Sequence, residues 1–171
     1  FGDGKRCKSR RVSALDNLVF RYLSGDLAKR LDPARRGVVA DRSAKKIGLG
    51  IAATCSEGVG AMDRLVAITV EYMNTRKQFG ATLASFQALR HRIADVKMQL
   101  ELARSMSYFA SLKLNEPAAQ RRRALSQAKV QLGQSMRFVG QQCIQLHGGI
   151  GVTDECAASH YFKRLTMLEL A

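Results

Sequence analysis

The sequence predicts an all-α protein built as an up-down four-helix bundle. Only two of the 171 residues are proline, and few runs of β-branched residues favour strands. Apolar residues recur every three or four positions over long stretches, which is the period of one helix face. Short links join these stretches, so consecutive helices should pack antiparallel with their apolar faces together.

The first predicted helix covers residues 48–77. Its apolar positions are spaced by three or four residues and comprise Cys55, Val59, Met62, Val66, Thr69 and Met73. Arg76 and Lys77 then fall in the last turn, where cations suit the helix dipole. Gly80 can end the helix in a left-handed conformation.

The second predicted helix covers residues 85–114. Ser85 is the expected N-cap, since its hydroxyl can accept a hydrogen bond from a free backbone N–H. The apolar face repeats at the same spacing and comprises Phe86, Leu89, Ile93, Val96, Leu100 and Ala103. Pro117 follows the break after this helix and suits the first turn of the next one.

The third predicted helix covers residues 117–146. Its apolar face comprises Leu125, Ala128, Leu132, Met136, Val139, Cys143 and Leu146. We expect residues 121–123, three consecutive arginines, to form a solvated surface near its start. The glycines at 148, 149 and 151 should end this helix.

The fourth predicted helix is capped by Thr153 and runs through His160 to the end of the chain. Residues 48–171 therefore read as one helical bundle. Residues 1–47 read as a basic N-terminal segment of uncertain structure, in which 12–31 can hold a helix and Pro33 can start another.

The formal net charge of +14 makes a basic helical nucleic-acid-binding module one alternative. Residues 1–50 hold 13 Lys or Arg against 5 Asp, but the remaining basic residues are scattered. Aromatic residues are only 6%, so no platform for stacking bases is predicted. We therefore expect no nucleic-acid partner.

Several other classes lack their sequence signals. The chain has no Glu-x-x-His pair for a di-iron bundle and no glycine-rich loop after a strand, and we expect no metal site. The sequence contains no apolar run of about 18 residues, so no membrane span is predicted. The first residues lack an apolar signal core, so we expect a cytoplasmic protein. The cysteines, Cys7, Cys55, Cys143 and Cys156, form no metal-ligand spacing, and we expect buried reduced thiols.

Two loops at predicted helix ends are the candidate functional segments: 76–80, with the sequence RKQFG, and 145–151, with the sequence QLHGGIG. Each alone can be a simple helix stop. Together with their surroundings they are more specific. The informative segments, in chain order, are Glu57–Met62, Glu71–Gly80, Phe86–Gln87, Ala94–Asp95 and Gln145–Thr153.

In order and spacing, these segments resemble the C-terminal helical domain of the acyl-CoA dehydrogenase family. The resemblance covers residues 48–171. It implies an FAD-dependent flavoprotein, an oxidoreductase that forms an α,β double bond in acyl-CoA thioesters of lipid metabolism. It also implies a homo- or hetero-oligomer, dimer or tetramer, with acyl-CoA as substrate and electron-transfer flavoprotein as electron acceptor.

In that family one subunit's bundle contacts the flavin cofactor held mainly by another subunit. The matching positions here are Arg76, Gln78, Phe79, Gln87, Gln145, Gly148 and Gly149. An arginine fork suits pyrophosphate oxygens, neutral amides suit phosphate, ribose or adenine edges, and a phenyl ring can pack on the adenosine end. His147 lies inside the second loop, and we expect it to be a structural residue or a neighbour of the adenine rather than a proton-transfer group.

The resemblance also implies a carboxylate base that removes the substrate's α proton while the β hydride goes to the flavin. In many members the base lies beyond the glycine loop, which corresponds to a position just after Ala171. Other members carry it on the first bundle helix, near Gly50, which cannot act. Glu57 and Glu169 are weak stand-ins, so the catalytic residue is unassigned.

Two further alternatives stay open. The chain can belong to a catalytically incomplete subunit that works beside a competent partner, or to a scaffold in which the bundle only assembles subunits. We expect this chain by itself to be inactive, because the domains that bind the thioester are not part of it.

Overall fold

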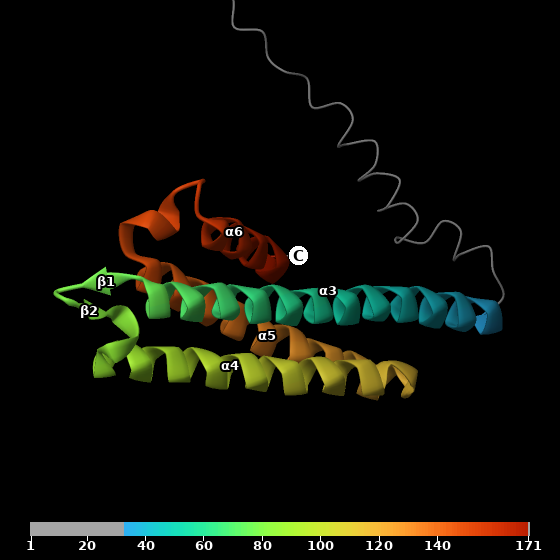
Figure 1. The fold of residues 1–171 in the computed structure, drawn as a ribbon. Coiled ribbons are helices and arrows are strands. Elements are labelled where there is room, and N and C mark those ends of the chain that lie inside the picture. Colours follow the sequence, from blue (N-terminus) through green and yellow to red (C-terminus); the bar gives the residue numbers. More distant parts are fainter. Residues whose placement is uncertain (1–32, 171) are drawn as a thin grey trace, which may run out of the picture. The chain divides into compact units, whose positions relative to one another are not determined.

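The structure, a computed structural model, describes residues 33–170, and residues from Ala44 on form one compact unit. Four α-helices are present in the described part of the chain (Figure 1). They are α3 (Pro33–Thr75), α4 (Gln87–Leu112), α5 (Ala118–His147) and α6 (Ala157–Leu170). The links hold two short strands, β1 (Lys77–Gln78) and β2 (Ala81–Thr82), and three 3₁₀ turns, η1 (Leu83–Ser85), η2 (Lys113–Asn115) and η3 (Gly148–Val152).

Consecutive helices run in opposite directions in the bundle, as Figure 1 shows by the colours along the chain. Helix α5 packs against both α4 and α6. Helix α3 approaches α5 where Gly58 faces Met136, and it contacts α4 through a hydrogen bond between the hydroxyls of Ser56 and Ser107. The predicted all-α, up-down four-helix bundle is confirmed.

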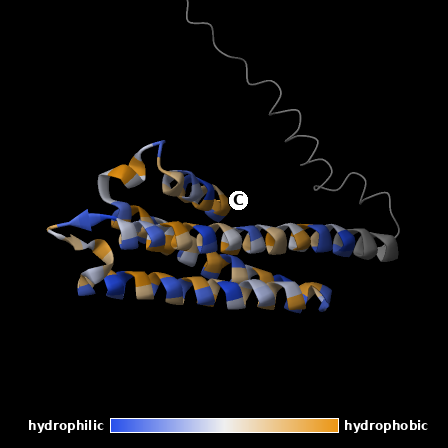
Figure 2. Ribbon diagram, in the orientation of Figure 1, coloured by the Kyte–Doolittle hydropathy of each residue, from blue (hydrophilic) through white to orange (hydrophobic). Residues whose placement is uncertain are grey.

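The apolar faces of the helices form one core. Figure 2 shows the underlying pattern, in which hydrophobic and hydrophilic positions are interspersed along each helix. Its fully buried large side chains include Met62, Leu65, Val96, Leu100, Leu132, Met136, Val139 and Leu165. All seven apolar positions predicted on α5 are buried. On α3 and α4 the predicted faces are buried or half-buried, so the helical period located the core correctly.

The end of the first helix differs from the prediction. Helix α3 ends at Thr75, and Arg76 and Lys77 lie beyond it, in an antiparallel hairpin that pairs Lys77 with Thr82 and Gln78 with Ala81. The helix also begins earlier than predicted, at Pro33 rather than at residue 48. Pro33 fits this start because a proline needs no backbone donor in the first turn.

Neither predicted hydroxyl cap is used. The hydroxyl of Ser85 donates to the Thr82 carbonyl at 2.6 Å, and Phe86 is the N-cap of α4. The hydroxyl of Thr153 donates to the Ile150 carbonyl at 2.8 Å, and α6 begins only at Ala157. Both hydroxyls lie at 3₁₀ turns. Each donates to the carbonyl three residues earlier and therefore does not cap the following helix.

The run of three arginines was predicted to be solvated, and for Arg121 this is wrong. Arg121 is buried, and its guanidinium donates to the Glu116 carbonyl at 3.1 Å. Arg122 and Arg123 are exposed as expected. The helical period turns the first arginine inward, where a backbone carbonyl satisfies its charged donor.

None of the helices in residues 33–170 is long and apolar enough to cross a bilayer.

Candidate cofactor-binding end of the bundle

The hairpin after α3 presents the first candidate loop to solvent. Arg76, Gln78 and Phe79 are all exposed, and the Phe79 ring is 96% exposed. Phe79 and Gly80 have φ values of 53° and 79°, and two positive φ values are what a type I′ hairpin turn requires. The Leu83 N–H donates to the Arg76 carbonyl at 2.9 Å and closes the base of the hairpin. The loop is therefore a defined protrusion.

The second candidate loop ends α5. Gly148 has φ 65° and ψ −146°, a conformation in which a side chain is strained, so it ends the helix as predicted. A Cβ atom at Gly148 or Gly149 would meet nothing within 4 Å, so the space beside both residues is open. At Gly151 a Cβ atom would lie 2.8 Å from the Ile144 carbonyl oxygen. Of the three glycines in this loop, Gly151 is thus the one that the local packing requires.

Tyr72 and His147 join the two loops. Their rings stack with centroids 4.6 Å apart, and the Tyr72 hydroxyl donates to the His147 carbonyl at 3.4 Å. Tyr72 lies one helical turn before Arg76, and His147 directly precedes Gly148. The hairpin and the glycine turn therefore lie at the same end of the bundle, as Figure 1 also shows.

His147 has a structural role in this arrangement. Its side chain is buried, and Nδ1 lies 2.9 Å from the Cys143 carbonyl oxygen. Because a carbonyl can only accept, Nδ1 carries a proton and donates it. Of the other histidines, His91 is exposed, and exposed His160 bonds the Asp154 carbonyl at 2.9 Å.

The amide candidates lie at the same end as the loops. Gln87 is the first residue of α4, and Gln145 lies in the last turn of α5; both are exposed. Among the described residues, none forms a hydrogen bond or an ion pair with the Arg76 side chain. This end thus presents an arginine fork, three amides, an aromatic ring and two glycines beside open space. That donor set fits a phosphate-containing dinucleotide.

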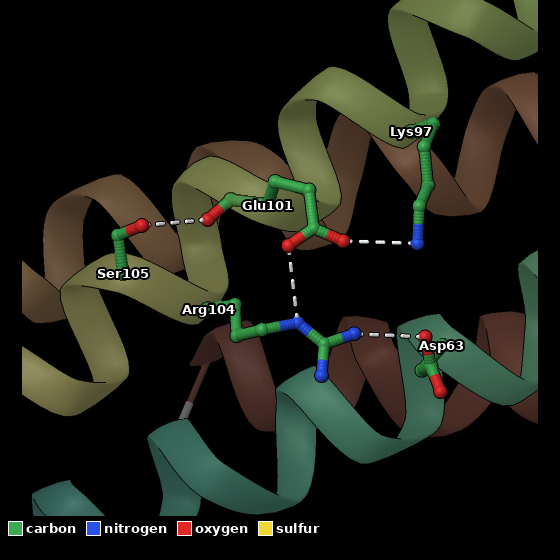
Figure 3. Close-up of polar contacts among 5 residues, drawn as sticks. All are labelled: Asp63, Lys97, Glu101, Arg104 and Ser105. Atoms are coloured by element: carbon green, nitrogen blue, oxygen red, sulfur yellow. Dashed lines mark hydrogen bonds and ion pairs between the residues drawn. The ribbon is translucent and has the colours of Figure 1, made fainter.

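The arrangement is braced by a charged network between α3 and α4 (Figure 3). The Arg104 guanidinium donates to Asp63 at 2.9 Å, across the two helices, and lies 3.3 Å from Glu101. Lys97 pairs with the other Glu101 oxygen at 2.9 Å. The hydrogen bond from Lys97, with the charges of Lys97 and Arg104, lowers the pKa of the Glu101 carboxyl. The contact between Arg104 and Asp63 thereby joins the outer surfaces of α3 and α4, the two helices that flank the hairpin.

The two weak base candidates are not brought to this end. Glu57 lies on α3, about 27 Å along the helix from Thr75 at 1.5 Å per residue, and accepts from Arg164 at 2.7 Å. Glu169 lies in the last turn of α6 and pairs with Arg137. Each carboxylate therefore has a cationic partner from another helix of the bundle.

The sequence patterns did not single out Tyr72, and they did not reveal the packing role of Gly151. Tyr72 occupies a half-buried position outside the predicted apolar face, so periodicity gave no reason to select it. Its place one turn before a candidate loop was the available signal. Gly151 was noted only as a helix stop, because the closeness of Ile144 becomes visible only once α5 and η3 are placed.

The sequence matches the family described as the acyl-CoA dehydrogenase C-terminal domain over residues 42–171, more than half of the chain. The chain belongs to the acyl-CoA dehydrogenase family. Acyl-CoA dehydrogenase IpdE2 of Mycobacterium tuberculosis is 39% identical over 109 residues, which cover 64% of this chain and 32% of that protein. The short/branched chain specific acyl-CoA dehydrogenase of Bos taurus is 32% identical over 115 residues, 67% of this chain and 26% of that protein.

Solved structures of the family agree with the fold. Butyryl-CoA dehydrogenase from Megasphaera elsdenii matches with a TM-score of 0.67 and 27% identity, over 74% of this chain and 33% of that one. The chain thus spans about a quarter to a third of the length of these acyl-CoA dehydrogenases. It corresponds to their C-terminal helical domain, and the family is one of oxidoreductases.

Proposed function

We propose that the chain is the part of an FAD-dependent acyl-CoA dehydrogenase that contacts FAD held mainly by a second subunit. The tie between Tyr72 and His147 carries this proposal, because it holds the hairpin and the glycine turn at one end of the bundle. The exposure of Arg76, Gln78, Phe79, Gln87, Gln145, Gly148 and Gly149 supports it. Residues that packed only within the chain would be covered.

Each residue has a task suited to its chemistry. Arg76 pairs with pyrophosphate oxygens, and the amides of Gln78, Gln87 and Gln145 bind polar edges of the phosphate, ribose or adenine. Phe79 packs on the flat adenosine end, and the Gly148–Gly149 turn lets the backbone approach without collision. When bound, FAD supplies the acceptor for the hydride that leaves an acyl-CoA thioester.

The same proposal extends to the whole protein. The substrate is an acyl-CoA, the electron acceptor is an electron-transfer flavoprotein, and the assembly is a dimer or tetramer acting in the cytoplasm in lipid metabolism. The base that takes the α proton is a carboxylate just after Ala171. Support comes from the ion pairs of Glu57 and Glu169, which already hold both alternative carboxylates against arginines.

The test is the substitution Arg76→Ala in the full-length protein. Removing a charged hydrogen-bonding partner of a phosphate costs about 1.5–3 kcal/mol, so the dissociation constant of FAD should rise at least about tenfold. The measurement is the ratio of flavin to protein absorbance after gel filtration, followed by titration of the apoprotein with FAD.

Arg123→Ala is the matched control, because Arg123 is an exposed arginine near the start of α5, remote from the two loops. It should keep the flavin content of the unsubstituted protein. Equal FAD retention in the Arg76 variant and in this control would refute the proposed site.

A further inference from the structure

The aromatic pair of Tyr72 and His147 is bonded through the backbone to both candidate loops. The Arg76 N–H donates to the Tyr72 carbonyl at 2.8 Å, so the residue that opens the first loop is bonded to the residue that carries the ring. On the other side, the Gly148 N–H donates back to carbonyls in the last turn of α5, which contains His147. Each ring therefore belongs to the helix end from which a loop departs.

His147 is held by contacts on three sides. Its Nδ1 donates to the Cys143 carbonyl at 2.9 Å, one helical turn earlier, and this bond sets the plane of the imidazole. The Tyr72 ring stacks on it with the two planes inclined by 23°. A Cβ atom at Gly151 would lie 2.9 Å from His147 Cβ, so the glycine turn packs on this residue as well. A shift of the imidazole would therefore displace the turn.

Tyr72 contacts His147 in two ways that differ in strength. Its hydroxyl makes a long hydrogen bond, 3.4 Å, to the His147 carbonyl, which belongs to the helix end where carbonyls lack partners within the helix. Its ring packs on a buried imidazole, and stacked rings stabilise by more than the area that they bury. We therefore expect the ring, more than the hydroxyl, to couple the two loops.

We propose that Tyr72 and His147 are positioning residues that make the two loops act as one FAD-binding unit. This inference rests on the proposed function, in which residues 76–80 and 145–151 contact the same cofactor. Two loops that move independently must each be ordered when a ligand binds, and this lowers the affinity. The aromatic pair holds them in one arrangement before FAD binds, so the contribution of each loop depends on the other.

The experiment removes FAD from the full-length protein and titrates the apoprotein with FAD. Tyr72→Leu deletes the ring and keeps an apolar side chain at this half-buried position. We expect the dissociation constant of FAD to rise about fivefold or more, the size of effect that couples residues in contact. Tyr72→Phe keeps the stacked ring and should restore most of the affinity.

A double-variant cycle with Arg76→Ala separates positioning from a general loss of stability. If Tyr72 acts by placing the loops, Tyr72→Leu should matter less once Arg76 no longer contacts FAD. The rise in the dissociation constant of the double variant should therefore be at least about threefold smaller than the product of the two single rises. Independent effects would multiply instead.

Amide hydrogen exchange of the apoprotein gives a readout that requires neither ligand nor activity. Tyr72→Leu should speed exchange over residues 148–153 about threefold or more, although the substituted residue lies on α3. This increase is expected because the ring that packs on His147 is lost. Tyr72→Phe should leave the exchange of the glycine turn close to that of the unsubstituted protein.

Two controls accompany these variants, and both should keep the FAD affinity of the unsubstituted protein. Tyr108→Leu is the matched substitution, because Tyr108 is an exposed tyrosine near the end of α4 that is remote from the loops. Leu132→Ala is the control for stability, because it opens a cavity in the core about 22 Å along α5 from His147.

The outcomes separate the two proposals. Unchanged FAD affinity or unchanged exchange of the glycine turn in Tyr72→Leu, or single rises that multiply in the double variant, would overturn the positioning role and leave the proposed function intact. An equal loss of affinity in either control would overturn it too. Equal FAD retention in Arg76→Ala and Arg123→Ala would instead overturn the proposed function, and the positioning role with it.

Discussion

Cys143 is a buried thiol between α5 and α3, and the protein environment suppresses its ionisation. Burial raises the pKa of this thiol to about 11, and a hydrogen bond with Thr69 only partly offsets the effect. Burial also raises the pKa of Cys55. The cysteines at 55, 143 and 156 are free, and the first two are buried. The expectation of reduced, buried thiols is confirmed for Cys55 and Cys143, whereas Cys7 lies outside the described residues.

Native protein treated with iodoacetamide at neutral pH should leave Cys55 and Cys143 unmodified, since the thiolate is the reacting form. Because folding raises the pKa of Cys143 from 9.0 to about 11, its protonated form stabilises the native state below pH 9. The free energy of unfolding should therefore fall as pH rises through this window. Peptide mass spectrometry and denaturant titrations check both statements.

The variant Cys143→Ala supplies the control, because it should lack this part of the alkaline dependence. Alkylation of Cys143 in the native protein as fast as in urea would contradict the assignment of a suppressed thiolate. So would an unfolding free energy that rises between pH 9 and 11.

Helix contacts depend on glycines that the sequence alone left unexplained. A Cβ atom at Gly140 of α5 would lie 2.9 Å from the ring of Phe162 on α6. At Gly60 of α3 nothing lies within 4 Å. The first glycine therefore sets how closely two helices approach, and the second does not.

Gly140→Val should lower the free energy of unfolding by about 1–3 kcal/mol, because a side chain is forced into a filled contact. Gly60→Val, the matched control, should change it by no more than about 0.5 kcal/mol. Denaturant midpoints at constant slope measure both. Equal midpoints for the two variants would show that α5 and α6 separate without cost.

Elements with a sustained period were predictable, and short or cross-helix features were not. Each helix face followed from the 3.6-residue repeat, which needs no knowledge of neighbours. The hairpin has strands of two residues, too short for any period, and places Phe79 at a φ that its residue type disfavours. The contact between Arg137 and Glu169 spans 32 residues and joins different helices, so no local pattern could reveal it.

At the scale of the whole molecule, two features bear on which partners the protein binds: its excess of basic residues and the proposed FAD site. Several arginines and lysines of residues 33–170 are paired with carboxylates, as in the contacts of Arg104 with Asp63 and Arg164 with Glu57. In the proposed function, the residues assigned to FAD form one wall of a site that a second subunit completes. The absence of nucleic-acid binding and the division at residue 47 both stay predictions.

The full-length protein should elute as a yellow dimer or tetramer, because the second wall of the flavin site belongs to another subunit in the proposed function. Gel filtration with light scattering, together with the visible spectrum, measures both properties. A colourless oligomer would instead favour a scaffold that only assembles subunits, and a yellow monomer would contradict a site shared between chains.

The backbone conformation of Phe79 lowers the stability of the fold, and its ring is left exposed. Glycine adopts a φ of 53° freely, whereas a side chain there costs about 1–2 kcal/mol. Its ring recovers little of this cost, since it touches Phe86 only edge-on and is otherwise surrounded by water. The fold thus loses some stability by keeping an aromatic ring in solvent. Selection for thermal stability alone would not maintain a phenylalanine at this position.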